Sequence, residues 1–301
     1  ENQVLRDWKP SEQLHLLAQG ATVRIGKRAR AEGSRVLCEV VNTHPEHRLR
    51  LMQLEAKRWG LKAWRPSLLR REKLILEEVA QADALLAPTQ HVANSFRQSG
   101  FTKPIHILPY AANVERFEPL EGPEKRLRHG PLRIISVGQI GLRKGQLHLL
   151  EVVSRLNFDI EITLVGDIDP EVIELLARHY QRFKHVARVA PPEMPKLLAN
   201  HDIFVSASLE EGLAVSVCEA MAMGLAVIAT RESGASEVMD DGVHGLLFDA
   251  TDQEALAEKI ACLNDDRDML SQISAAAFMR TRLLVNWRTY ADGLEHIYGT
   301  R

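Results

Sequence analysis

The sequence lacks the features that mark a secreted, membrane-spanning or nucleic-acid-binding protein. It has three cysteines, Cys38, Cys218 and Cys262, and this odd number without paired spacing indicates reduced thiols in a cytosolic protein. No apolar run approaches the length of a bilayer span, and no signal-peptide pattern opens the chain. The net charge of −2 gives no electrostatic reason to expect a nucleic acid as a partner.

Motifs for dinucleotide, P-loop and metal chemistry are also missing. The glycine-rich turn at 138–145 fits neither GxGxxG nor the P-loop, in which Lys is followed by Ser or Thr, and this disfavours a nicotinamide oxidoreductase. No cluster of His, Cys and Asp has metal-ligand spacing. Asp167 and Asp169 form an Asp-any-Asp triplet of a kind that can bind a divalent metal, but Asp169 before Pro170 is an ordinary helix N-cap. We therefore expect no metal.

The first 120 residues predict a partial α/β domain. A helix that Thr89 caps, with Val92 and Phe96 turned inward, is expected between two short apolar strands. A strand, a helix and a strand in succession indicate a parallel sheet. The expected helices cover residues 11–33, 46–59 and 67–82, and the expected strands cover 36–41, 84–87 and 105–108.

The rest of the chain predicts a second α/β domain. Residues 120–130 have the composition of a linker, so we divide the chain into a first domain at 1–120, a second at 131–283 and a last helix at 284–301. Helices alternate with strands expected at 132–137, 160–165, 186–189, 203–205, 225–229 and, at an edge, 246–248. This alternation predicts a doubly wound parallel sheet. The tail has helical spacing, and we expect core packing for its residues Trp287, Tyr290, Leu294, Ile297 and Tyr298.

The stretch SASLEEGLAVSVCEAMAMGLAVIAT, from Ser206 to Thr230, predicts a loop, a helix, a turn and a buried strand. The amides near the helix start, from Leu213 to Val217, would have no partner within the helix and would favour a phosphate. Glu211 and Glu219 frame that start, and a carboxylate has two acceptor oxygens that match a vicinal diol. The alternative is that each is an ordinary helix-terminal or solvated glutamate.

The turn from Gly138 to Gly145 supplies two adjacent cations, Arg143 and Lys144. A glycine-rich strand-to-helix turn lets the backbone approach a phosphate, and two cations there would offset a diphosphate. The alternative is an exposed helix start, where cations are mildly unfavourable.

The pattern Glu, seven residues, Glu within EGLAVSVCEAMAMGLAVIAT resembles the donor-binding signature of the retaining glycosyltransferases of GT-B family 4. The segments ADALLAPTQHVANSFRQSGF and IHILPYAANVERFEP resemble the end of the first domain in the same family. The resemblance implies a GT-B fold, in which two Rossmann-like, doubly wound domains face a cleft. It also implies a metal-independent transfer of a hexose-type sugar from a nucleotide diphosphate sugar.

The family's site residues can be carried over position by position. The resemblance implies that Glu211 lies beside the donor hexose, that Glu219 takes the ribose hydroxyls and that Lys144 holds the diphosphate. It implies that backbone groups complete the donor site at Gly138, Gly212, Leu213, Ala214 and Val215.

The sequence departs from this pattern at three places. Ala214 and Ser216 stand where Gly and Pro are common, from which we expect an altered sugar preference with retained binding. Gln139 stands where a basic residue is frequent, and Arg143 is the substitute or the site carries one charge fewer.

His44 stands at the end of a predicted strand, where a side chain would face the cleft. The resemblance implies a histidine near the donor sugar at this place, and a purely structural loop histidine is the alternative. We expect a sugar, lipid or small-molecule acceptor and a cytoplasmic protein. A membrane surface or phosphorylated acceptor is the alternative to a solvated face for the basic residues Lys62, Arg65, Arg70, Arg71 and Lys73.

The first domain is shorter than the resemblance implies, and no Gly-Gly loop follows an early strand. We expect a fragment or an N-terminally shortened protein, and hypothesise that the chain binds a nucleotide sugar but transfers it poorly. One alternative is a non-catalytic sugar-nucleotide-binding module. Another is a GT-B epimerase, which needs an acid and base pair for which Glu211 and His44 are the candidates.

Overall fold

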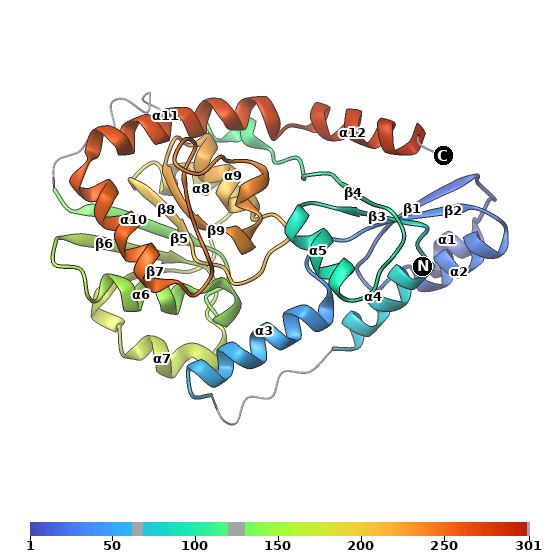
Figure 1. Cartoon of the computed structure of the whole chain (residues 1–301), viewed down its shortest axis with the longest axis horizontal. Helices are drawn as coiled ribbons and strands as arrows, with labels where there is room; N and C mark the ends of the chain where they lie inside the picture. Colours follow the sequence, from blue (N-terminus) through green and yellow to red (C-terminus); the bar gives the residue numbers. More distant parts are fainter. Residues whose placement is uncertain (62–68, 120–129, 300–301) are drawn as a thin grey trace.

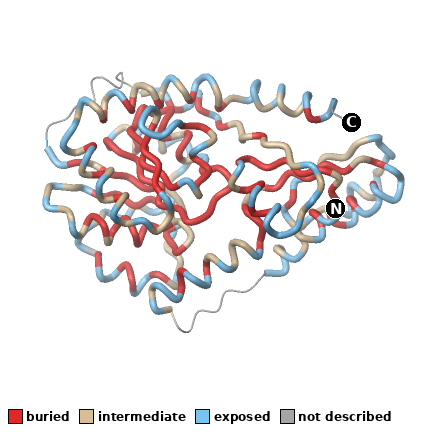
Figure 2. Tube along the Cα trace, in the orientation of Figure 1, coloured by how far each residue is buried: buried red, intermediate tan, exposed pale blue. Residues whose placement is uncertain are grey.

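The computed structural model describes residues 1–61, 69–119 and 130–299, which form two α/β units in contact with each other (Figure 1). Most of the expected linker at 120–130, together with Lys62 and Arg65, lies outside the described residues. Buried residues run along the strands of both sheets and continue across the junction between them (Figure 2). Both sheets are parallel, as the alternation of strands and helices predicts.

The first sheet has four strands in the order β1-β2-β3-β4. Because each strand is added on the same side of the previous one, right-handed crossovers place the connecting helices on one face. Helices α2, α4 and α5 cover this face (Figure 1). The elements of this half are α1 (Asn2–Arg6), β1 (Gln13–Leu17), α2 (Val23–Ala31), β2 (Arg35–Glu39), α3 (Pro45–Arg58), α4 (Arg70–Gln81), β3 (Ala84–Ala87), α5 (Gln90–Gln98) and β4 (Ile105–Ile107).

The single helix expected over residues 11–33 is wrong. Gln13–Leu17 forms the edge strand β1 instead, paired in parallel with β2 from Gln13↔Arg35 to Leu17↔Glu39. Gly20, at φ 77°, then turns the chain into the shorter helix α2. The apolar residues of a strand and of a following helix together imitate one helical period, because Leu14, Leu17, Ala21 and Ile25 are spaced by three or four residues.

The second sheet has six strands in the order β10-β9-β8-β5-β6-β7. Successive residues of a strand point to opposite faces, and in β8 Ile203 and Val205 pack on one apolar core while Phe204 packs on the other. Its elements are β5 (Leu132–Val137), α6 (Gln146–Val153), β6 (Ile160–Val165), α7 (Ile173–Ala177), β7 (Lys184–Val186), α8 (Met194–Leu198), β8 (Ile203–Ser206), α9 (Val215–Ala222), β9 (Ala226–Thr230), β10 (Leu246–Phe248), α10 (Gln253–Asp265), α11 (Arg267–Leu284) and α12 (Trp287–Gly299).

Three details of this half differ from expectation. The strand expected at 186–189 is β7 at Lys184–Val186, so that Arg188 and Val189 belong to the loop after it. Asp169 precedes a short 3₁₀ turn without capping it, because its side chain accepts a hydrogen bond from Gln139 instead. Trp287 and Tyr298 are not in the core but are 64% and 39% exposed.

Helix α3 belongs to the first half of the sequence but packs on the second domain. Its residues Met52 and Ala56 join the apolar core built on β5, α6 and α10. Glu55, 3% exposed, lies with its Oε1 2.6 Å from Nε2 of His148 on α6 and also accepts a hydrogen bond from the Trp59 indole. Figure 1 shows α3 running below the junction, from the first sheet to α7 and α6.

Helix α12 returns to the first domain and covers the face of its sheet that α2, α4 and α5 leave open (Figure 1). Ile297 packs with Leu37, Leu86 and Leu108, and the hydroxyl of Tyr290 lies 3.0 Å from Oε2 of Glu39. The two halves are therefore joined both by α3 and by α12.

Candidate functional site

The candidate site lies at the carboxyl ends of β5 and β8. These strands are neighbours, and the order of the sheet reverses between them, since β6 and β7 continue on one side and β9 and β10 on the other. A ligand crevice is expected outside the strand ends at such a switch point. The loop after β5 passes Gly138 into a 3₁₀ turn at Leu142–Lys144, and the loop after β8 carries Glu210, Glu211 and Gly212 to α9.

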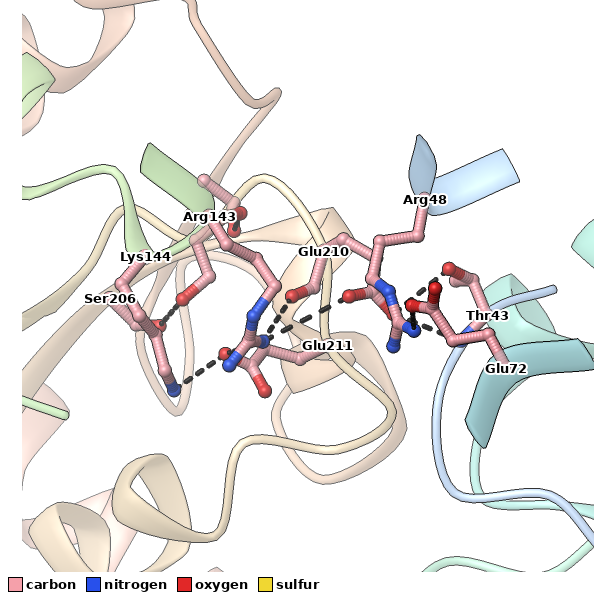
Figure 3. A network of polar contacts seen from close by, with 10 residues as sticks. Thr43, Arg48, Glu72, Arg143, Lys144, Ser206, Glu210 and Glu211 are labelled. Atoms are coloured by element: carbon pink, nitrogen blue, oxygen red, sulfur yellow. Dashed lines mark hydrogen bonds and ion pairs between the residues drawn. The ribbon is translucent and has the colours of Figure 1, made fainter. Parts of the chain in front are cut away.

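The structure brings Arg143, Lys144 and Glu211 into direct contact, as Figure 3 shows. Oε1 of Glu211 lies 2.5 Å from Nζ of Lys144 and 2.8 Å from Nη1 of Arg143. Burial by itself would raise the pKa of the Glu211 carboxyl, but Lys144 and then Arg143 outweigh it, so this pKa lies below its ordinary value. Glu211 is thus an anion held by both cations of the turn.

Gly138 lets Lys144 reach this position. Its φ of 139° suits glycine, and a Cβ added there would lie 3.0 Å from Cε of Lys144, so the lysine side chain folds closely over the turn. Gly138 also lines a cavity of about 430 Å³ at the ends of β5, β6 and β7. The other lining residues are Val137, Gln139, Val165, Gly166, Asp167, Arg188, Val189 and Met194.

The start of α9 has backbone amides without a protein acceptor, as expected, but fewer than the expected range from Leu213 to Val217. Val217 donates to the carbonyl of Ala214, and Ala214 donates to that of Ser233, so these two amides are not available to a ligand. In the described part of the chain, the amides of Leu213, Val215 and Ser216 donate to no protein acceptor. An anion at this helix start would meet these three donors and the helix dipole.

Glu219 lies one turn inside α9 and is partly buried. Its carboxylate forms no hydrogen bond or ion pair within the described residues, and burial raises its pKa to about 7. A half-buried carboxylate without protein partners is suited to accept hydroxyl groups from a ligand.

The first domain meets the site through the loop after β2. A Cβ added to Gly212 would lie 1.8 Å from the carbonyl oxygen of Val41, so the two backbones touch. Two residues further, Thr43 donates to Oε1 of Glu210 from its amide and from its hydroxyl, each at 2.9 Å. The sequence predicts no role for Glu210, because its contact with Thr43 joins residues 167 positions apart and has no local signal.

His44 has structural contacts in this structure. Its Nδ1 accepts a hydrogen bond from the amide of Glu46 and so caps α3, and its own amide donates to Oγ of Ser95 at 2.9 Å. Its ring packs edge-on against Phe96, and burial lowers its pKa. A neutral His44 with an accepting Nδ1 carries its proton on Nε2, which leaves that nitrogen as a donor.

Within residues 1–61, 69–119 and 130–299, no three His, Cys, Asp or Glu side chains gather closely enough to hold a metal ion. None of the helices in these ranges combines the length and apolar character needed to cross a bilayer.

Gln139, which stands where a basic residue is frequent in the family pattern, donates to Asp169 at the edge of the cavity.

Residues 131–266 match the family model described as glycosyl transferases group 1. This segment is a glycosyl transferases group 1 domain. The match ends in α10 and covers β5 to β10, including both loops of the candidate site. The expected family resemblance is thereby confirmed for this part of the chain.

Relatives of the chain are named as glycosyltransferases. MMP alpha-(1->4)-mannosyltransferase of Mycolicibacterium hassiacum is 27% identical over 272 residues, which are 85% of this chain and 63% of that protein. Alpha-maltose-1-phosphate synthase of Mycolicibacterium smegmatis is 31% identical over 178 residues, which are 54% of this chain and 46% of that protein. The chain thus spans less than two thirds of the length of these relatives.

Solved structures confirm the fold. Sucrose-phosphate synthase from Thermosynechococcus elongatus superposes with a TM-score of 0.74 at 20% identity, covering 95% of this chain and 73% of that one. HepE of Anabaena in complex with UDP gives a TM-score of 0.77 at 17% identity, covering 99% of this chain and 80% of that one. The likeness extends over both domains, and the chain has the GT-B fold.

Proposed function

We propose that this chain transfers a hexose-type sugar from a nucleotide diphosphate sugar to a hydroxyl group of an acceptor, as a retaining family 4 enzyme without a metal ion. The observation that carries the proposal is the contact of Lys144 and Arg143 with Glu211 beside the α9 amides and the cavity at Gly138. Two cations, three free amides and a cavity at a switch point form a site for a nucleotide diphosphate.

Each group of the site then has a task. Lys144, Arg143 and the amides of Leu213, Val215 and Ser216 would stabilise the negative charge that grows on the leaving diphosphate, which is usually the largest catalytic term. Glu211 would leave the cations as the phosphates arrive and turn to the hexose. Glu219 would accept the ribose hydroxyls, and the cavity between Val165 and Met194 would take the nucleoside.

The names of similar proteins support the donor class. One superposed structure contains UDP and another of the same protein contains UDP-glucose. A metal ion has no task in this proposal, because the protein's own cations and amides face the diphosphate. The acceptor is a hydroxyl compound, either a sugar, a lipid or a small molecule, approaching from the first domain.

A thermal-shift screen against UDP, GDP and ADP sugars tests the proposal. At least one donor should raise the Tm of the wild-type chain by a few degrees, because a ligand that binds the folded state stabilises it. Glu219→Ala should weaken the response to every active donor, and Lys144→Ala should weaken it further. Lys259→Ala on α10, which removes an equal charge outside the site, should respond as the wild type does.

Two results would contradict the proposal. One is that no donor of the three nucleotide classes shifts the Tm, and the other is that both site variants respond like Lys259→Ala. Product analysis of the same samples measures transfer and donor hydrolysis by the 301-residue chain. Robust turnover would overturn the expectation that this chain transfers poorly.

A further inference from the structure

A buried carboxylate lies on the seam between the two domains. Glu210 is fully buried, and its Oε1 accepts two hydrogen bonds of 2.9 Å from Thr43, which is itself 2% exposed. Thr43 belongs to the loop that leads from β2 to α3 in the first domain, and Glu210 belongs to the loop before α9 in the second. The contact therefore fixes one domain against the other through a charged group.

On the other side of the seam, Glu210 contacts the turn that carries the cations. Nη1 of Arg143 donates to the carbonyl oxygen of Glu210 at 2.9 Å and lies 3.9 Å from its carboxylate Oε2. The same nitrogen lies 2.8 Å from Oε1 of Glu211. A continuous polar chain thus runs from Thr43 through Glu210, Arg143 and Glu211 to Lys144 (Figure 3).

A buried carboxylate is an energetically unfavourable contact between two domains. Burying a charge costs more than an apolar contact of the same size, and a well-packed apolar pair would often bind as firmly. Oε2 of Glu210 is buried and accepts no hydrogen bond in the described part of the protein. Because only one of its two oxygens accepts hydrogen bonds, the position of the Glu210 carboxylate depends on where the Arg143 guanidinium lies. The geometry of the contact between the domains therefore depends on Arg143 as well.

Other seams of the molecule give a comparison. Tyr290 of α12 contacts Glu39 of the first sheet, and His148 of α6 contacts Glu55 of α3, so both are also carboxylate contacts between the halves. Neither pair contacts Arg143 or Lys144. Among these three seams of the described residues, the Glu210 contact is the one joined to the candidate donor site.

Building on the proposed function, we propose that Glu210 is a positioning residue for transfer. It holds the Val41–His44 loop, and with it the acceptor side of the cleft, at the spacing from the cationic turn that the reaction requires. Arg143 contacts Glu210 and, in the proposed function, faces the donor phosphates, so Glu210 lies between the donor side and the acceptor side of the site.

The test compares Glu210→Gln and Thr43→Val with Tyr290→Phe, which removes hydrogen bonds at a different seam. Affinity for a nucleotide sugar is measured by calorimetry, transfer by product analysis and domain spacing by small-angle X-ray scattering. We expect the two seam variants to lower kcat/KM for transfer about 10- to 100-fold, since a displacement of about 1 Å can cost that much. Donor affinity should stay within about twofold, and Tyr290→Phe should transfer nearly normally.

The double variant measures the coupling directly. If Glu210 and Thr43 act as one unit, the kcat/KM of the double variant should be no lower than that of the less active single variant. Additive losses, a parallel loss of donor affinity, or an equal loss in Tyr290→Phe would overturn the proposal.

The scattering data keep the inference separate from the transfer reaction. If the wild-type chain transfers no sugar, the proposed function is wrong. The radius of gyration then tests by itself whether the Glu210–Thr43 contact sets the spacing of the two domains. Expansion in Glu210→Gln and Thr43→Val, but not in Tyr290→Phe, would support the positioning role. An unchanged radius in both seam variants would overturn it.

Discussion

At the scale of single residues, the two glutamates of the motif have opposite environments. Glu211 is held by two cations, and its pKa is lowered, whereas Glu219 has no partner, and its pKa is raised to about 7 by burial. Identical side chains eight positions apart therefore do different work. The cations thus favour the charged form of Glu211, whereas Glu219 changes its charge near neutrality.

The titration of Glu219 gives a prediction for stability. Its folded pKa of about 7 lies above its ordinary value of 4.5, so the folded chain binds more protons between these values. Stability contributed by this residue therefore falls as pH rises from about 4.5 to 7. Glu219→Gln should be more stable than the wild type by about 1–3 kcal/mol at pH 8 and by much less at pH 5. Urea unfolding at both pH values measures the difference.

The same titration affects ligand binding. In the proposed function the charged form of Glu219 would accept both ribose hydroxyls, so the Tm shift caused by an active nucleotide sugar should grow from pH 6 to pH 8 in the wild type. It should change little in Glu219→Gln. A stability difference equal at pH 5 and 8, or a pH dependence retained in the variant, would show that Glu219 does not titrate as described.

At the scale of elements, the sequence predicted most strands and helices but not where α3 packs. The strands at 132–137 and 160–165 have the predicted bounds, because each is a short segment rich in β-branched and apolar residues between turn residues. Strand β1 was missed because Leu14 and Leu17 also fit the period of the helix that follows. The docking of Met52 and Ala56 on the second domain has no local signal, since an amphipathic helix does not specify which core it joins.

The same limit applies to the candidate site. The family pattern and the glycine-rich turn predicted that Lys144, Glu211 and Glu219 serve one donor site, and periodicity predicted the start of α9. Pairing between Glu211 and the cations depends on distances between two loops that are 67 residues or more apart, as in the Arg143 to Glu210 contact. The capping of α3 by His44 is a local contact with the amide of Glu46, whereas the contact of Glu210 with Thr43 joins residues 167 positions apart and has no local signal.

The packing of α3 gives the prediction at this scale. Glu55→Ala would leave His148 and the Trp59 N–H without their buried acceptor, and we expect a loss of about 3 kcal/mol in the free energy of unfolding. Glu258→Ala, on the exposed face of α10, should change it by less than about 0.5 kcal/mol. Urea unfolding measures both, and equal effects would mean that the Glu55 contacts do not hold α3 in place.

At the scale of the whole molecule, the two domains meet through backbone as well as side chains. Gly212 touches the carbonyl of Val41, and a Cβ added to Gly234 would lie 2.8 Å from Cγ2 of Thr89. At these two points the domains lie so close together that one added methyl group would push them apart.

Gly212→Ala tests this tight approach. Its new Cβ would lie 1.8 Å from the Val41 oxygen, so the domains must move apart, at a cost of about 1–3 kcal/mol. We expect a lower Tm and a larger radius of gyration. Gly299→Ala is the control, because a Cβ added there meets no atom within 4 Å. If Gly212→Ala has the same Tm and radius as the control, the approach of the two backbones is looser than described.

Because Met52 and Ala56 of α3 pack in the core of the second domain, a cut in the chain between the domains would expose part of that core. A recombinant fragment beginning near Gly130 would lack Met52 and Ala56, which cover apolar residues of the second domain. Its bared surface would promote self-association. Engineering that exchanges donor domains between enzymes of this architecture would have to carry α3 along with the domain that it covers.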